Sequence, residues 1–277
     1  MSTSAEAWIG RSRELRDEIA PGQARRVMAL LDLSGEPPAV LPPHWYPIYF
    51  PEIAPQSELG PDGHPRKGDF LPPIELPRRM FAGRRVRFPG GALRLGQEAT
   101  KRSEVAAITP KQGRSGRMVF VTIRHSIACA GEVVAIEEQD VVYREAATGN
   151  PVAEPTPAPA PVAWQRVVTP DPVMLFRYSA ITFNGHRIHY DADYARGQEG
   201  YPALVVNGGL TTLLLVETAL AHGGGRRLAG FEARAMRPLF CGRPILLAAG
   251  AEQGGRQQVW AADDAGALAF SLVLEWA

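Results

Sequence analysis

The sequence has few cysteines and no long apolar run. Cys129 and Cys241 are the only two cysteines among 277 residues and stand far apart, so they give neither a disulfide framework nor a metal-ligand spacing. Such sparse use of cysteine is typical of a protein in a reducing cytosol. No apolar run reaches transmembrane length, and residues 1–8 are small and polar instead of forming an apolar signal core. We therefore expect a cytoplasmic protein with no membrane partner.

An excess of charge of either sign is also absent. Lysine and arginine total 30 and aspartate and glutamate total 29, for a net charge of +1. Bulk electrostatics thus favour neither nucleic acid nor an anionic membrane as a partner. The sequence also lacks a Walker-type phosphate loop, a dinucleotide fingerprint and a zinc spacing. We expect no nucleic acid, no cofactor and no metal.

Glycine and proline are abundant, and the prolines gather in loops. The chain has 28 glycines and 25 prolines, with 45% hydrophobic residues, and is long enough for one large or two ordinary domains. Residues 147–163 form a Pro/Ala-rich segment, which is typical of an extended, semi-rigid linker. We therefore predict an N-terminal domain over residues 1–146, the linker 147–163, and a C-terminal domain over residues 164–277.

The two predicted domains share one pattern of strands. Residues 11–33 are predicted to form two short helices, with Pro21 near the start of the second, and residues 35–77 an ordered covering loop. Alternation then predicts strands over 85–88, 92–95, 97–109, 118–130 and 132–143, and, in the second half, over 228–238, 244–252, 256–262 and 268–276. A faint internal repeat relates residues 88–96 to residues 240–248, so both halves use one sheet motif.

A buried helix stands out in the second half. Residues 209–222 are apolar nearly all round, which is typical of a helix enclosed by other elements. Glu217 is the one acidic residue within it and is either exposed or partnered. The helix follows Asn207-Gly208-Gly209, and glycine allows a ligand to approach the backbone closely. Its free N–H groups and dipole favour an oxygen that gains negative charge, although the turn taken alone is better explained as a simple glycine cap on a core helix.

Two polar residues that could support chemistry precede this helix. Asn184 and His189 stand five residues apart in the segment Phe183–Asp191, and Asp191 or Asp193 is a candidate helix cap. Histidine carries a mobile proton near neutral pH. Asparagine cannot act as a base, but its amide can hold a water or a carbonyl group.

This segment resembles the MaoC-like hydratase and dehydratase family. Members carry an Asp-x-Asn-Pro-x-His motif, followed by Asp and by Tyr/Phe-Ala. Aligned on the last histidine, the family histidine falls on His189 and the family aspartate on Asn184, with Asp191 and Tyr194-Ala195 following. The whole phrase is closer to a subgroup of mesaconyl-C4-CoA (3-methylfumaryl-CoA) hydratases, itaconyl-CoA hydratases and 3-hydroxyacyl-thioester dehydratases, in which the asparagine is usual.

The resemblance extends to the N-terminal half. Similar phrases there are Leu41–Trp45, Leu59–Pro65, Phe70–Pro73 and Pro77–Met80. The subgroup reads Val-Val-His-Gly-Pro-Leu before the buried helix, where this chain has Asn207 in place of histidine and Gly209 in place of proline. The implied fold is α+β, a double hot dog in which two antiparallel sheets each wrap a helix and the C-terminal helix is long and buried.

The resemblance also implies roles for individual residues. In water addition to an α,β-unsaturated acyl-CoA, His189 would move the proton, Asn184 would hold the water or the acyl group, and backbone N–H groups of Gly208 or Gly209 would stabilise the enolate. Candidate substrate-binding residues are Arg78, Arg79, Arg187, Asn207 and Tyr201. The arginines suit CoA phosphates or a substrate carboxylate, with ordinary surface charge as the alternative.

Three functions remain open from the sequence. The first is hydration of a short branched dicarboxylic acyl-CoA of the mesaconyl or itaconyl type. The second is a 3-hydroxyacyl-thioester dehydratase of fatty-acid synthesis, and the third is a non-catalytic acyl-CoA-binding subunit, which the departure at Asn207 motivates. An acyl-CoA is the expected partner in each case, and a homo-oligomer is compatible with all three.

Overall fold

The fold is built on one large antiparallel sheet. A computed structural model describes residues 5–66, 70–76, 78–113, 116–145 and 155–277. Its ten-stranded sheet has the order β1-β5-β6-β7-β3-β9-β12-β11-β10-β8. In chain order these strands are β1 (Ser12–Glu18), β3 (Arg78–Arg87), β5 (Glu98–Gly113), β6 (Gly116–Cys129), β7 (Glu132–Arg144), β8 (Trp164–Val168), β9 (Leu228–Ala235), β10 (Ile245–Ala249), β11 (Arg256–Ala262) and β12 (Leu268–Trp276). A separate two-stranded ladder joins β2 (Val40–Leu41) to β4 (Leu93–Arg94).

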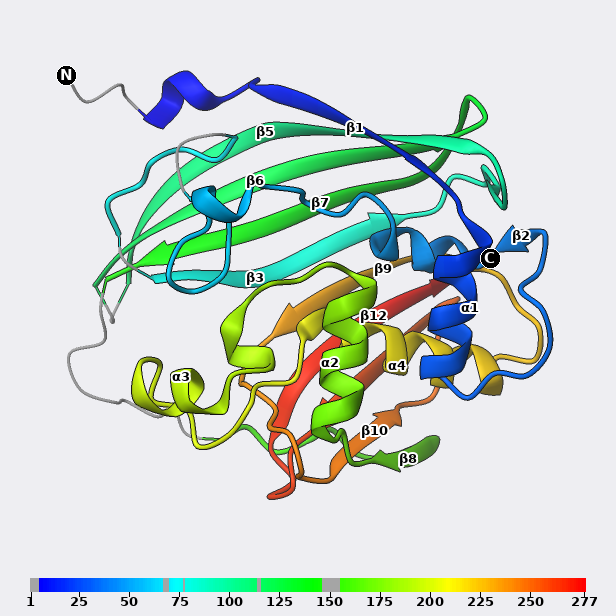
Figure 1. The fold of residues 1–277 in the computed structure, drawn as a ribbon. Coiled ribbons are helices and arrows are strands. Elements are labelled where there is room, and N and C mark those ends of the chain that lie inside the picture. Colours follow the sequence, from blue (N-terminus) through cyan, green and yellow to red (C-terminus); the bar gives the residue numbers. More distant parts are fainter. Residues whose placement is uncertain (1–4, 67–69, 77, 114–115, 146–154) are drawn as a thin grey trace.

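The sheet repeats one motif about its centre. Reading outward from the central β3–β9 pair, β7, β6, β5 and β1 on one side correspond to β12, β11, β10 and β8 on the other. The strands also follow the same chain order in both halves. The predicted internal repeat is therefore a pair of five-stranded units fused at β3–β9, and the predicted double hot-dog architecture is confirmed. Figure 1 shows the two units stacked along the shared sheet.

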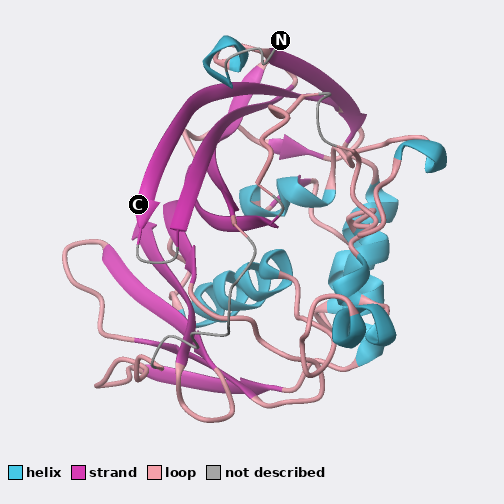
Figure 2. Cartoon of the chain, turned by 90° about the vertical axis from the view of Figure 1, so that its left-hand side faces the viewer, coloured by secondary structure: helices cyan, strands magenta, loops and turns pink. Residues whose placement is uncertain are grey.

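Helices fill the curve of the sheet. They are α1 (Pro21–Leu30), α2 (Pro172–Ile181), α3 (Ala192–Gly197) and α4 (Gly208–His222), with short 3₁₀ turns η1 (Ala5–Trp8), η2 (Pro43–Ile48), η3 (Gln56–Glu58) and η4 (Arg187–His189). Figure 2 shows the strands curving round the helices. None of the helices in the described ranges is long and apolar enough to cross a membrane.

Helix α4 is buried along nearly its whole length, as its composition predicts. Leu210, Leu215 and Val216 are fully enclosed and belong to the main core, and α4 packs on strands β9 to β11. Glu217 is partnered, because its Oε1 accepts hydrogen bonds from His44 Nε2 at 2.7 Å and from Trp45 Nε1 at 2.6 Å. These two donors come from the covering loop of the first half, so the loop is anchored on α4.

The prediction for residues 11–20 is wrong. A helix was expected there, but Ser12–Glu18 is strand β1, which pairs with β5 at the sheet edge. Leu15 and Ile19 are four residues apart, as on one helix face, yet the exposure alternates with period two along the strand. Alternation is the strand signal, and here polar residues on both faces masked it. The second predicted helix is confirmed as α1, with Pro21 at its first position.

The Pro/Ala segment lies only partly within the described residues. Residues 147–154 fall outside them, whereas residues 155–163 run along the second half. Leu268 N donates to Thr156 O at 2.8 Å, and Ala163 N donates to Ala249 O at 2.7 Å. The end of this segment is thus held by backbone hydrogen bonds to the C-terminal strands. The exact division of the chain at residues 146 and 164 stays a prediction.

Candidate active site

His189 is buried at the end of η4, against the chain that leads into α4. Its Nδ1–H donates to Val205 O at 2.7 Å, and Val205 N donates to Ile188 O at 2.9 Å. The carbonyl can only accept, so this bond fixes the proton on Nδ1 and leaves the Nε2 lone pair available. Burial lowers the pKa of His189 to about 4, against the opposing effect of the Val205 bond. His189 is therefore a neutral imidazole at neutral pH, with Nε2 unprotonated.

Asn184 shapes the turn that precedes η4. Its Oδ1 accepts the backbone N–H of His186 at 3.0 Å, and its own backbone N–H donates to Ser179 O at 2.8 Å. This Asx-type bond replaces a backbone turn and fixes the chain between α2 and η4. The structure thus gives Asn184 a positioning contact toward His186, while its expected role in holding water or the acyl group stays a prediction.

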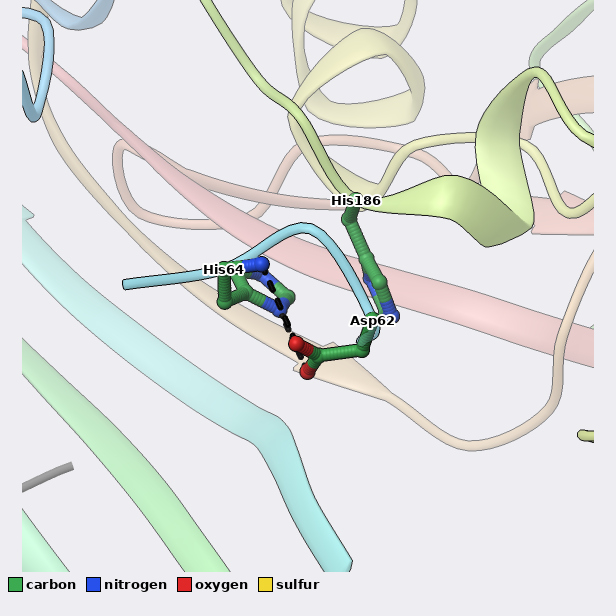
Figure 3. Close-up of side chains that lie close together, drawn as sticks. All are labelled: Asp62, His64 and His186. Atoms are coloured by element: carbon green, nitrogen blue, oxygen red, sulfur yellow. Dashed lines mark hydrogen bonds and ion pairs between the residues drawn. The ribbon is translucent and has the colours of Figure 1, made fainter. Parts of the chain in front are cut away.

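His186 lies beside His189, in contact with a further histidine that the sequence reasoning missed. The ring centroids of His186 and His189 are 5.4 Å apart, and those of His186 and His64 are 4.2 Å apart. Burial lowers the pKa of His186 to about 3, and the charge on His64 acts in the same direction. Figure 3 shows His64 and Asp62 on the loop of the first half, facing His186 of the second. The only sequence signal for them was the phrase Leu59–Pro65, to which no role had been assigned.

The first turn of α4 provides the second part of the candidate site. Asn207 is only 2% exposed and makes no side-chain cap on the helix. Its Nδ2 reaches Ser179 Oγ at 3.5 Å, and its Oδ1 has no hydrogen-bond partner in the described part of the chain. The first N–H groups of a helix have no partner within it. Gly208 and Gly209 therefore stand at a helix start that is suited to an oxygen with developing negative charge.

Tyr178 is a further site residue that the sequence did not indicate, and its hydroxyl explains why position 209 is a glycine. A Cβ atom at Gly209 would overlap the Tyr178 hydroxyl, whereas at Gly208 it would meet only Phe270 Cε2 at 3.7 Å. Burial raises the pKa of Tyr178 to about 12, so the hydroxyl is protonated. The tyrosine thus brings an O–H group against the helix start, where the sequence suggested only backbone donors.

The candidate substrate-binding residues are spread over three regions. Arg79 is half-buried on β3, and its charge is among those that lower the pKa of His186, after burial, His64 and His189. Arg78 opens the same strand, but its side chain lies outside the described part of the structure. Tyr201 lies in the segment before α4, with its ring centroid 6.2 Å from that of Phe240. Of these candidates, Arg79 is the one whose positive charge acts on His186.

Arg187 is engaged in contacts that hold the site together. Its Nη2 donates to Asp191 Oδ2 at 2.8 Å, its Nη1 donates to Pro61 O at 3.0 Å, and its guanidinium lies 4.1 Å from the Tyr194 ring centroid. Asp191 also caps α3 by accepting from Tyr194 N at 2.9 Å, which confirms it as a helix cap. Arg187 thus ties the loop of the first half to the second half. Its expected role in substrate binding stays a prediction.

Comparisons with known proteins agree with this architecture. The family of hydroxyacyl-thioester dehydratases type 2 matches residues 44–241. The mesaconyl-C(4)-CoA hydratase of Chloroflexus aurantiacus is 47% identical over 97% of this chain and 96% of that protein. The mitochondrial hydroxyacyl-thioester dehydratase type 2 of Schizosaccharomyces pombe is 28% identical over 74% of this chain and 76% of its own length.

Solved structures show the same fold at low identity. A MaoC-like dehydratase from Phytophthora capsici superposes with a TM-score of 0.78 at 12% identity, covering 99% of this chain and 98% of that one. A Mycobacterium tuberculosis protein described as having a double hot-dog fold gives a TM-score of 0.56 at 14% identity, covering 97% and 96%. The solved structures thus share the fold, and the family match over residues 44–241 with the 47% identical relative shows that the chain belongs to the hydroxyacyl-thioester dehydratase type 2 family.

Proposed function

We propose that the protein catalyses the reversible addition of water to the double bond of an α,β-unsaturated acyl-CoA. The observation that carries this proposal is the pairing of a buried, neutral His189 with the uncapped start of α4. Addition at the β-carbon needs a group that takes a proton from water and donors that stabilise the enolate oxygen. The near-full-length relative that is a mesaconyl-C(4)-CoA hydratase supports the same reaction class.

The acyl group proposed is a short, branched dicarboxylic one of the mesaconyl type. Arg79 supports this choice, because its positive charge acts on His186 and a guanidinium can pair with a second carboxylate on the substrate. An itaconyl group has the same charge and is the close alternative.

The proposal needs no metal and no cofactor, since CoA is part of the substrate. The cytoplasm is the proposed location, which the two unpaired cysteines suit.

A hydration assay tests the function directly. Mesaconyl-C4-CoA, itaconyl-CoA and crotonyl-CoA are each incubated with the protein while loss of the enoyl absorbance is followed. We expect the protein to hydrate all three thioesters, with mesaconyl-C4-CoA turned over fastest. No turnover on any of them by a folded protein would leave the non-catalytic acyl-CoA-binding subunit as the better description.

Dehydration of 3-hydroxyacyl thioesters is the second candidate function. It is supported by the family match and by the Schizosaccharomyces pombe relative. Both reactions pass over the same enolate, so they differ in substrate rather than in the groups required. Faster turnover of long monocarboxylic 3-hydroxyacyl thioesters than of mesaconyl-C4-CoA would favour this reading.

The role of Arg79 in substrate choice gives a separate prediction. Arg79→Gln should lower turnover of mesaconyl-C4-CoA relative to crotonyl-CoA by about 10- to 100-fold, the loss expected for one charge-assisted contact. Arg85→Gln on the same strand is the matched control, because Arg85 is paired with Asp140 at 2.7 Å on the exposed side. Kinetics on both substrates measure the ratio, and an unchanged ratio in Arg79→Gln would refute the carboxylate contact.

A further inference from the structure

A loop from the first half is locked onto the proposed active site of the second. Arg187 N donates to Asp62 O at 2.9 Å, and Arg187 Nη1 donates to Pro61 O at 3.0 Å. Gly63 has a φ of +86°, and a Cβ atom there would overlap the carbonyl oxygen of Gly185. The two backbones meet so closely that only glycine is accommodated at this crossing. Asp62 and His64, on either side of Gly63, are therefore held in place relative to the site histidines.

Asp62 and His64 form an oriented pair. Asp62 Oδ2 lies 3.0 Å from His64 Nδ1, and Asp62 Oδ1 accepts the backbone N–H of His64 at 3.1 Å. Both carboxylate oxygens are thus engaged by one residue. Burial would raise the pKa of Asp62, but the hydrogen bonds and charge of His64 outweigh it and hold that pKa well below its usual range. Asp62 is consequently ionised, so Nδ1 carries the hydrogen and Nε2 is the nitrogen that exchanges a proton.

The pair supplies a chemical group that the second half lacks. The family aspartate is Asn184 here, and an amide cannot give or take a proton. Hydration nevertheless involves two proton movements, one away from the water and one onto the α-carbon. His189 accounts for the first. The ring centroid of His186 lies 5.4 Å from that of His189 and 4.2 Å from that of His64, so the three imidazoles form one cluster at the candidate site.

We propose that the Asp62–His64 pair is the second proton-transfer group of the site, with His64 Nε2 protonating the α-carbon. The inference rests on the hydration proposed above. In this step His189 Nε2 takes a proton from water while the oxygen bonds to the β-carbon, and the double-bond electrons move to the thioester oxygen. Protonated His64 then gives its Nε2 proton to the α-carbon as the enolate collapses. Solvent takes the proton from His189 and returns one to His64, so the cycle balances.

Asp62 acts on His64 in two ways. Its carboxylate holds the ring in one orientation, and it stabilises the positive charge when the imidazole is protonated. Asp62 is therefore a positioning residue, and His64 is the residue proposed to touch the reacting carbon. Neither role needs an ion. The same three residues, Asp62, His64 and His186, do offer ligand atoms within 4.8 Å of one another, so a bound cation is the competing arrangement that the test must separate.

The test measures the α-carbon proton separately from the carbon–oxygen bond. The 3-hydroxyacyl-CoA product is incubated in D₂O with enzyme, and NMR follows exchange of the α-hydrogen while mass spectrometry follows ¹⁸O exchange of the hydroxyl. His64→Gln should slow α-hydrogen exchange and net hydration by about 100-fold or more, the usual loss for a missing general acid. Asp62→Asn keeps an oxygen for the His64 N–H and should lose less, with one limb of the pH–rate profile shifted. His222→Gln, on the far end of α4 where the ring stacks on Trp164, is the matched control.

The outcomes distinguish this inference from the proposed function. If the wild-type protein hydrates an enoyl-CoA while His64→Gln and Asp62→Asn both retain its rates, the pair has no part in proton transfer and the inference is overturned, although hydration stands. If the wild type is folded but inactive on every thioester, the function itself fails. If activity disappears on treatment with a chelator and returns with Zn²⁺, the residues act as metal ligands and the inference is also overturned. A His64→Ala variant assayed with added imidazole separates loss of the proton-transfer group from a local packing defect. We expect imidazole to restore part of the activity. Activity that is lost and that imidazole does not restore contradicts the proposed role of His64.

Discussion

His189 and His186 differ at the level of single hydrogen bonds. His189 has its Nδ1 fixed by Val205 O, whereas His186 is held through its backbone, whose N–H donates to Asn184 Oδ1 and whose carbonyl accepts from His189 N. His189→Ala should therefore lower turnover by about 100-fold or more, the range for loss of a general base. His186→Ala should mainly disturb packing between the rings of His64 and His189. Steady-state kinetics on folded variants measure both, and comparable losses would mean that the two histidines work together.

Asn184 gives a prediction of a different kind. Asn184→Asp retains an oxygen for the His186 N–H and restores the acid of the wider family, so activity should be largely kept. Asn184→Ala removes the bond, which costs about 1 kcal/mol of stability, and turnover should fall less than in His189→Ala. Thermal unfolding and kinetics of the two variants provide the measurements. If Asn184→Asp is as damaging as His189→Ala, the amide has a role that the turn does not explain.

At the scale of elements, the start of α4 depends on the contact between Gly209 and Tyr178. Gly209→Ala places a methyl group on the Tyr178 hydroxyl, and overpacking of this kind costs about 1–3 kcal/mol. Turnover should fall as well, since the first turn shifts. Gly208→Ala is the matched control, because its Cβ has an ordinary 3.7 Å contact with Phe270.

A second substitution checks the cause of that effect. Adding Tyr178→Phe to Gly209→Ala removes the hydroxyl that the methyl group meets, so part of the lost stability should return. Denaturant unfolding of the single and double variants measures this coupling. Equal effects of alanine at positions 208 and 209 would show that the Tyr178 contact is unimportant.

The elements with regular apolar patterns were predictable from the sequence. Helix α4 was expected over 209–222 and is Gly208–His222, and strands β11 and β12 have the predicted bounds. Strand β1 was missed, because an edge strand with polar residues on both faces has little apolar alternation. Prediction therefore succeeded where an element has a regular apolar pattern and failed where that pattern is absent.

The site shows the same division between local and distant information. Asn184 and His189 lie in one segment, so their spacing could be aligned. Asp62 and His64 are far from that segment in the sequence, and the close backbone contact between Gly63 and Gly185 places them beside it. That contact depends on tertiary docking, which no periodicity reports. Tyr178 escaped notice for the same reason, because only the fold places it against Gly209.

At the scale of the whole molecule, the first half buries a polar network beneath its sheet. Tyr46 donates its hydroxyl to Glu137, Arg84 Nη1 lies 3.4 Å from Glu137 Oε1, and His125 Nδ1 lies 2.7 Å from Ser103 Oγ. Burial raises the pKa of Glu137, but the charges of Arg84 and Lys101 and the hydrogen bond from Tyr46 outweigh it and lower that pKa. Burial and the charge of Lys101 lower the pKa of His125 to about 3, with Glu137 acting in the opposite direction. The fold therefore holds an ionised glutamate beside a neutral histidine.

This arrangement predicts that the fold loses stability in mild acid. An unfolded histidine has a pKa of about 6.5, so between pH 6.5 and about 3 the unfolded chain binds a proton that folded His125 does not. The free energy of unfolding is therefore highest above pH 6.5 and falls as the pH is lowered, by about 2 kcal/mol at pH 5 for one such histidine. Buried His186 and His189 act in the same direction. Urea unfolding at pH 7 and pH 5 measures the slope, and His125→Gln, which keeps a polar group for Ser103, should make it shallower. If the slope in His125→Gln is as steep as in the wild type, a group other than His125 causes the loss of stability in acid.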